Sequence, residues 1–238
     1  MTFGAFALSI LMVFSSCDLT NTTKGLGIGT GSGALLGGIV GHLIGKDTKG
    51  TVIGAALGAG VGAGAGYLIG HKMDKAKEAA QQALANAQVE SITDANELPA
   101  LKITLDSGIL FSSGSSELTS TSKAALDKFA TDVLIPNANM DVAIMGHTDN
   151  VGFKGVTSQD ENDRRNQELS LARAGAVSNY LVNKGVLPKQ IKAVEGFGPF
   201  QPVASNDTDA GKAQNRRVEV YMYASEEMVK EAEAGTLN

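Results

Sequence analysis

Glycine recurs at every fourth residue in the first third of the chain, and this period limits what the segment can form. One series occupies positions 25, 29, 33, 37, 41 and 45, and a second occupies 50, 54, 58, 62, 66 and 70. Neither half contains Asp, Glu, Lys or Arg, and the segment's only charges lie between them in residues 46–49 (KDTK). A flexible Gly/Ala linker is the alternative. However, a linker needs no such register.

A membrane explains this period better than water does. Glycine costs about 1 kcal/mol relative to Ala in a helix in water. In lipid the backbone must hydrogen-bond to itself, and small residues let helices pack closely. Each half has 21 residues, about 31 Å of helix, which matches one hydrocarbon layer. We therefore predict a membrane helical hairpin over residues 25–70, with glycine faces that also allow a homo-oligomer. The pattern does not identify the membrane.

Residues 1–17 have the features of an export signal. The apolar run 3–14 has the length of a signal-peptide core and is short for a spanning helix. Cys17, the chain's only cysteine, follows it directly, so no internal disulfide is available. The arrangement resembles a bacterial lipoprotein signal, which implies lipidation of Cys17, although no Lys or Arg precedes the run. A plain signal peptide with an incidental cysteine is the alternative, and residues 18–24 form a polar spacer.

The next segment has a helical period with a narrow face of small side chains. The stripe lies within residues 71–90 and contains Ala76, Ala79, Ala80, Ala83, Leu84 and Ala87. Such a stripe suits a stalk or a weak self-association seam better than a core. We therefore predict a helical stalk and linker over residues 71–97.

The remaining chain predicts an α+β domain over residues 98–224. Period-two patterns indicate strands at 101–105, 141–145, 191–197 and 217–223. One helical pattern stops before Pro136, and another runs from Asn166 as N-cap to Gly185 as C′ residue. This βαβαβ–β order predicts a two-layer sandwich of helices on one mixed sheet. Residues 225–238 read as a short charged helix or a frayed tail.

Two charged side chains are expected close together in this domain. Asp149 lies just past a predicted strand end, and Arg173 lies about two turns into the following predicted helix. A carboxylate can accept from an ammonium, and a guanidinium can grip a carboxylate through two parallel bonds. The pair would suit a zwitterionic ligand. A routine surface salt bridge is the alternative.

Three motifs in order resemble the OmpA-like peptidoglycan-binding domain, across residues 98–224. They are GHTDN (146–150), NQELSLARAGAV (166–177) and the segment 196–220 ending in NRRVEV. The resemblance implies non-covalent binding of a diaminopimelate residue of the peptidoglycan stem peptide. It implies that Asp149 holds the ammonium and Arg173 the carboxylate, and that the pocket is lined by Thr148, Asn166 and one of Arg216 and Arg217.

One segment departs from this family pattern. Residues 153–165 (FKGVTSQDENDRR) form a longer and more charged loop than the family usually carries. The loop could roof the pocket, bind a partner or remain free, and the sequence does not choose among these. Its carboxylates Glu161 and Asp163 are expected to be solvated.

The combined features predict a non-enzymatic anchor between a membrane and peptidoglycan. The glycine-rich segment is similar to the glycine zippers of bacterial envelope proteins. The expected location is the outer membrane, lipid-anchored, with the C-terminal domain in the periplasm; the inner membrane is the alternative. The alternative function is an oligomeric pore, or a transport or motor component, attached to the wall. A stator needs a carboxylate within the membrane, whereas neither half contains Asp or Glu, and His42 is their only histidine.

Other function classes find little support in the sequence. The net charge of −5 disfavours nucleic acid as a partner. The histidines at 42, 71 and 147 lack metal-ligand spacing. There is no Cys/His pair and no serine elbow. We therefore predict no catalytic residue, no metal and no cofactor.

Overall fold

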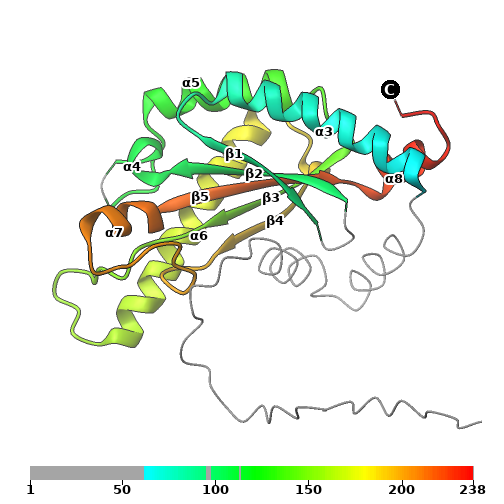
Figure 1. The fold of residues 1–238 in the computed structure, drawn as a ribbon. Coiled ribbons are helices and arrows are strands. Elements are labelled where there is room, and N and C mark those ends of the chain that lie inside the picture. The colour runs from blue at the N-terminus through cyan, green and yellow to red at the C-terminus, as the bar shows by residue number, and fades with distance from the viewer. Residues whose placement is uncertain (1–61, 95–97, 113, 238) are drawn as a thin grey trace, which may run out of the picture. The chain divides into compact units, whose positions relative to one another are not determined.

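The computed structural model describes residues 62–94, 98–112 and 114–237, which contain a five-stranded sheet with the order β1-β2-β5-β3-β4 (Figure 1). Strands β3 and β4 run parallel, and the other neighbouring strands run antiparallel. The strands are β1 (Gln88–Thr93), β2 (Pro99–Asp106), β3 (Met140–Gly146), β4 (Ile191–Gly196) and β5 (Arg217–Ala224). The predicted α+β class is confirmed.

The main helices pack on one face of this sheet, which makes the two predicted layers. The main core joins inward residues of β2, β3 and β5, such as Ile103, Ile144 and Val220, to helices α3, α5, α6 and α8. A smaller cluster built on Met145 and Tyr221 lies on the opposite face. The helices are α3 (Ala63–Ala83), α4 (Ser107–Leu110), α5 (Ser120–Lys128), α6 (Gln159–Asn183), α7 (Asp209–Asn215) and α8 (Glu226–Glu233), with the π-helical turn η1 (Phe129–Leu134) and the 3-10 turn η2 (Pro188–Gln190).

The four predicted strands are present, and the sequence did not reveal the fifth. Strand β1 pairs antiparallel with β2 at the edge of the sheet. Its residues are exposed or half-buried throughout. A strand with no buried position leaves little hydrophobic alternation to detect, so β1 was assigned to a linker.

The predicted stalk is wrong, because its helix belongs to the folded domain. Helix α3 begins at Ala63 and packs against β2, η1 and α8 (Figure 1). Ile69 and Met73 are 0% and 2% exposed, and they extend the alanine stripe toward the N-terminus. These larger side chains widen the stripe into a face that joins the main core. Residues 71–83 are therefore part of a helix of the domain, and they do not form a separate spacer.

The predicted membrane hairpin lies mostly outside the described residues. Residues 25–61 and Cys17 are in that part of the chain, whereas Gly62–Gly70 reach into α3. No described helix has both the length and the apolar character needed to cross a bilayer. A methyl group placed on Gly62 or Gly66 would meet nothing within 4 Å. In the described part of the hairpin, those two glycines therefore face open space.

The C-terminal segment forms a short helix that docks on the domain, so the helix alternative is confirmed and the frayed tail is not. Met228, Val229 and Ala232 of α8 are buried in the main core. Ser225 caps the helix by accepting from the backbone N–H of Met228 at 3.1 Å. Its hydroxyl also donates to the carbonyl of Asn139 at 2.6 Å. Helix α8 is held in place by this apolar face, which is hard to recognise in the sequence because charged residues surround it.

Helix α6 begins earlier than predicted. It starts at Gln159, so Asn166 is an interior residue and the second half of the predicted loop is helical. Glu161 pairs with Arg164 and Arg165, and Arg164 also pairs with Glu168. These are the i,i+3 and i,i+4 spacings that support a helix. The predicted end is confirmed, with Gly185 at φ +98°.

Ile69 provides a test of the docked position of α3. We expect Ile69→Ala to lower the free energy of unfolding of residues 62–238 by about 2–4 kcal/mol, because it leaves a cavity in the core. The measurement is denaturant unfolding. Tyr67→Ala is the matched control: Tyr67 lies on the same helix at 72% exposure, and its change should stay within about 0.5 kcal/mol. Equal effects of the two variants would contradict the docked helix.

Candidate functional site

Asp149 and Arg216 meet at one end of the sheet, because β5 begins beside the end of its antiparallel neighbour β3. The two strands are antiparallel, with Gly146 opposite Val218. Asp149 follows β3 by three residues, and Arg216 directly precedes β5. Nη1 of Arg216 donates to Oδ2 of Asp149 at 2.5 Å. Two segments far apart in sequence thus form one charged cluster.

The Asp149 carboxylate is held in place and largely buried, behind a more exposed arginine. Its Oδ1 accepts from the backbone N–H of Val151 at 3.1 Å. The residue is 6% exposed, whereas the Arg216 side chain is 39% exposed. An ion pair with one water-exposed partner is usually weak, about 1 kcal/mol or less. A ligand cation can therefore compete with Arg216 for this carboxylate.

Arg173 approaches the same cluster from α6 and is largely buried. Its Nε donates to the carbonyl oxygen of Ser115 at 3.0 Å, and its guanidinium lies 5.3 Å from the ring centre of Phe111. Burial lowers the pKa of Arg173, the positive charge of Arg216 lowers it further, and Asp149 opposes both effects. Within the described residues, no hydrogen bond or ion pair joins Arg173 to Asp149, and the two terminal nitrogens of Arg173 have no protein partner. The guanidinium keeps a two-pronged donor for a ligand carboxylate.

Thr148 and Asn166 lie in the walls of this region, each 3% exposed. Nδ2 of Asn166 donates to the carbonyl of Val151 at 3.1 Å and so ties the Asp149 loop to α6. The backbone N–H of Thr148 donates to the carbonyl of Gly198 at 2.9 Å. The Thr148 hydroxyl is buried without a partner. The structure brings both residues to the cluster, and their contact with a ligand stays a prediction.

Helix α6 packs closely on the ends of β3 and β4, and this contact fixes the distance of Arg173 and Asn166 from the sheet. A methyl group on Gly146 would lie 2.0 Å from the carbonyl oxygen of Ser170, and one on Gly196 would lie 2.4 Å from the backbone nitrogen of Leu171. Real side chains do not tolerate such distances. Glycine at the ends of β3 and β4 therefore permits the helix to pack directly on the backbone.

The inserted segment does not roof this cluster with an independent loop. Its second half forms the first turns of α6, and Asn162 holds the rest. Oδ1 of Asn162 accepts from the backbone N–H of Phe153 at 2.7 Å, and its Nδ2 donates to the carbonyl of Val156 at 3.4 Å. The segment is thus an extension of α6 with a loop fastened to it.

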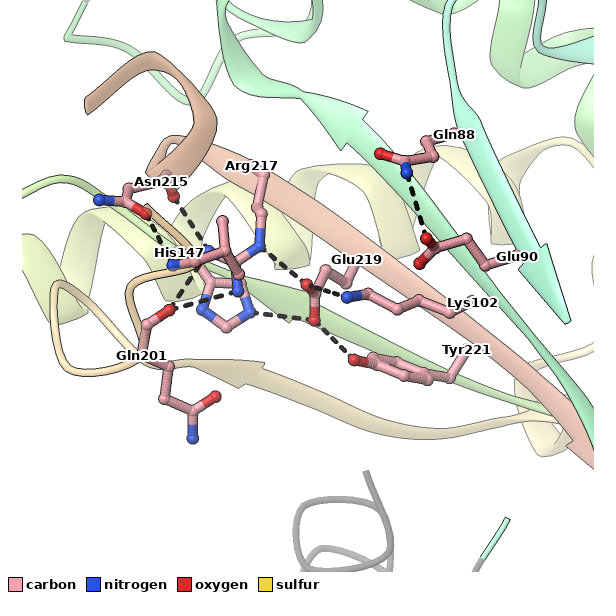
Figure 2. Close-up of polar contacts among 10 residues, drawn as sticks. Gln88, Glu90, Lys102, His147, Gln201, Asn215, Arg217, Glu219 and Tyr221 are labelled. Atoms are coloured by element: carbon pink, nitrogen blue, oxygen red, sulfur yellow. Dashed lines mark hydrogen bonds and ion pairs between the residues drawn. The ribbon is translucent and has the colours of Figure 1, made fainter. Parts of the chain in front are cut away.

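Arg217 takes part in a second polar network, which is built around Glu219 (Figure 2). Its Nε donates to Oε1 of Glu219 at 2.8 Å, and Nζ of Lys102 lies 3.0 Å from the same oxygen. The Tyr221 hydroxyl donates to Oε2 of Glu219 at 2.6 Å, and Nε2 of His147 lies 3.5 Å from it. Of the two candidate arginines, only Arg216 joins the Asp149 cluster.

The charges around Glu219 decide its protonation. Burial alone would raise the pKa of Glu219, but the contact with His147 and the positive charges of Arg217 and Lys102 together hold it below its ordinary value. Burial lowers the pKa of His147 more than Glu219 raises it, so the imidazole is neutral at pH 7. Glu219 is therefore an ionised carboxylate with several donors around it.

The sequence analysis missed this network. Its signal was present in β5, where Arg217, Glu219 and Tyr221 alternate with Val218 and Val220. Only the apolar half of that alternation was used to predict the strand. The other half marked a polar row on the opposite face.

Other predicted features have plain outcomes. Cys17, the lipidation candidate, lies outside the described residues. Within the described ranges, no three His, Cys, Asp or Glu side chains are grouped as metal ligands. The predictions of no cofactor and no catalytic residue remain predictions.

Comparisons with known proteins identify two family regions. Residues 110–216 match the OmpA family, and residues 1–74 match the YMGG-like Gly-zipper. These matches confirm both resemblances drawn from the motifs. They cover the candidate cluster and the glycine-periodic segment respectively.

Individual relatives share only part of their length with this chain. Outer membrane porin F of Pseudomonas fluorescens is 46% identical over 89 residues, which are 37% of this chain and 24% of the porin. Peptidoglycan-binding protein ArfA of Mycobacterium tuberculosis is 44% identical over 79 residues, which are 33% of this chain and 21% of ArfA. A solved MotB-like protein from Desulfovibrio vulgaris has a TM-score of 0.54 at 24% identity, covering 66% of this chain and 97% of that one. The structural match supports the fold alone.

Gly146 offers a test of the close helix contact. We expect Gly146→Ala to lower the free energy of unfolding by about 1–3 kcal/mol, because the added methyl group forces α6 away from β3. Denaturant unfolding measures this change. Gly175→Ala in the same helix is the control, since a methyl group there meets nothing within 4 Å. It should be neutral or stabilising by up to about 1 kcal/mol. A harmless Gly146→Ala variant would show that the contact is not tight.

Glu219 offers a test of the second network. We expect Glu219→Gln to cost about 3 kcal/mol of folding free energy, because it leaves buried cations without their counter-charge. The pKa of Glu219 is depressed, so its stabilisation is present above the ordinary glutamate pKa and is lost as pH falls through the folded value. Glu168→Gln, which breaks an exposed ion pair on α6, should change stability by less than about 1 kcal/mol. Equal costs for the two variants would argue against the network.

Proposed function

We propose, from the OmpA family domain of residues 110–216, that this chain is a non-enzymatic anchor that joins a bacterial membrane to peptidoglycan. The C-terminal domain would bind the cell wall without forming a covalent bond. The similarity to a protein named as peptidoglycan-binding supports this function. The name of the porin relative supports an envelope location.

One observation carries the proposal: among the described residues, the terminal nitrogens of Arg173 have no protein partner, and the Asp149 carboxylate acts on the same guanidinium. Arg173 is 5% exposed and is fixed through Nε alone. A buried guanidinium with unused donors is costly unless a ligand completes it. Its planar fork matches a carboxylate.

The ligand would be the diaminopimelate residue of the stem peptide. This residue carries an ammonium and a carboxylate on one carbon, which matches Asp149 and Arg173. Arg216 would yield one carboxylate oxygen of Asp149 to the incoming ammonium, since its side chain is 39% exposed. Thr148 and Asn166 would shape the pocket, and Arg217 would act only through the neighbouring network.

The membrane end of the anchor rests on the sequence. The proposal places a lipid on Cys17 in the outer membrane, with the domain in the periplasm. The YMGG-like Gly-zipper match over residues 1–74 supports packing of the glycine-periodic helices in or against that membrane. A homo-oligomer through the glycine faces is part of the same proposal.

A membrane-embedded pore or a motor component is the second candidate. Its support is the glycine-zipper match together with the 34% identity, over 120 residues, to a relative named motility protein B from Bacillus subtilis. Such a protein would use the same domain for wall attachment. The two candidates therefore differ in the membrane segment and agree on the Asp149 site.

Co-sedimentation with insoluble, diaminopimelate-containing peptidoglycan tests the shared site. The fragment 62–238 is suitable because the main core lies between Ala65 and Leu237. We expect Asp149→Ala and Arg173→Ala to weaken binding about 10- to 100-fold, as for loss of a charged hydrogen bond. Arg173→Lys should also weaken it, because an ammonium lacks the planar fork.

The matched control is Arg164→Ala, which removes an exposed arginine from the same helix. It should bind as the unaltered protein does. Thermal unfolding of every variant separates lost binding from lost folding. Full binding by a folded Asp149→Ala variant would overturn the proposed site.

A further inference from the structure

A second pocket of about 450 Å³ lies beside the Asp149 cluster, between the edge of the sheet and α7. Half of its lining residues are charged, and most of the others are neutral and polar. We call it the amide pocket and define it by Asn86, Gln88, Thr104, Val203, Gln214 and Arg216. The volume is in the range of pockets that hold small ligands.

Arg216 belongs to both sites. Its Nη1 holds Asp149 at 2.5 Å, and the residue also lines the amide pocket. Val203, 54% exposed, stands at the same pocket. A ligand held at Asp149 could therefore extend past Arg216 into the amide pocket.

The charges of the amide pocket are balanced, which favours a neutral ligand. Lys102, Arg216 and Arg217 face Glu90, Asp106 and Glu219 along its lining. At the floor, Lys102 and Arg217 already satisfy Glu219 (Figure 2). No net charge is left over for an ion among these lining groups.

The remaining groups are those that recognise hydroxyl and acetamido groups. Gln88 on β1 donates to Glu90 at 3.1 Å and keeps its carbonyl oxygen for a ligand (Figure 2). Asn86 and Gln214 are exposed amides, and Thr104 adds a half-buried hydroxyl. Amides and hydroxyls both donate and accept, as do the polar groups of an N-acetylated sugar.

We propose that the amide pocket is a saccharide subsite that binds the sugar portion of the polymer whose peptide binds at Asp149. The inference rests on the proposed function, because it assigns the second half of the same ligand. The chain would then recognise the junction between sugar and peptide. A wall fragment that carries both should bind more tightly than the peptide alone.

Isothermal titration calorimetry on the full chain in detergent tests this. The probes are the stem tripeptide that ends in diaminopimelate, the same tripeptide on the N-acetylglucosamine–N-acetylmuramic acid disaccharide, and the disaccharide alone. We expect the unaltered chain to bind the sugar-linked peptide about tenfold more tightly than the peptide, as two neutral hydrogen bonds would provide. The double variant Gln88→Ala/Gln214→Ala should bind both at the affinity of the peptide.

The control is Gln82→Ala/Gln159→Ala, which removes two exposed amides outside the pocket. It should keep the tenfold preference. A double variant at Gln88 and Gln214 that keeps the preference overturns the subsite and leaves the Asp149 site intact, as does an unaltered chain with no preference. If the unaltered chain binds neither peptide probe, both proposals fail. Asp149→Ala should weaken both peptide probes equally.

Discussion

The direct packing of α6 on the ends of β3 and β4 is the contact on which the candidate site depends. Gly146 and Gly196 allow it, because any side chain there would overlap the helix backbone. The position of Arg173 relative to the loop that carries Asp149 is then fixed by the packing of α6. Among the described residues, no hydrogen bond or ion pair joins the two side chains. A packed core is not continuously deformable. The spacing of the two charges is therefore a property of the fold, and the proposed ligand would meet a preformed pair.

Two consecutive arginines at the start of β5 belong to two different charged clusters. Arg216 precedes β5 and pairs with Asp149, whereas Arg217 begins the strand and points to Glu219. Both residues line the amide pocket, but they pair with different carboxylates. The buried Glu219 network fixes Arg217, and so fixes where β5 starts. The exposed Arg216 is then left at the boundary between the Asp149 cluster and the amide pocket, where it can rearrange.

The sequence predicted the elements whose hydrophobic period is strong and missed those whose period is masked. Val142 and Ile144 marked β3, and the alternation of Val218 and Val220 marked β5. In contrast, β1 has no buried residue, and the charged start of α6 was read as a loop because only apolar spacing was considered. The family motif implied that Asp149 and Arg173 act together, and in the structure the charge of Asp149 does act on Arg173; their role in a ligand site stays a prediction. It could not choose between Arg216 and Arg217, since that choice depends on which carboxylate each guanidinium pairs with in the fold.

Helix α3 shows why a stripe of small residues is ambiguous in sequence. Ala76 and Ala80 alone suggest a narrow seam that suits a free stalk. Ile69 and Met73 lie on the same face one and two turns earlier, and both are buried against the domain. Ile69 lies within the glycine series and Met73 just after it. Residues 50–70 were therefore interpreted as a membrane helix, and the amphipathic pattern that Ile69 and Met73 share with the alanines was missed. Helix α3 buries one face in the domain, and Gly62 and Gly66 at its N-terminal end face open space. The composition of the segment does not separate the buried face from the open face. Only the angular position of each residue around the helix does so.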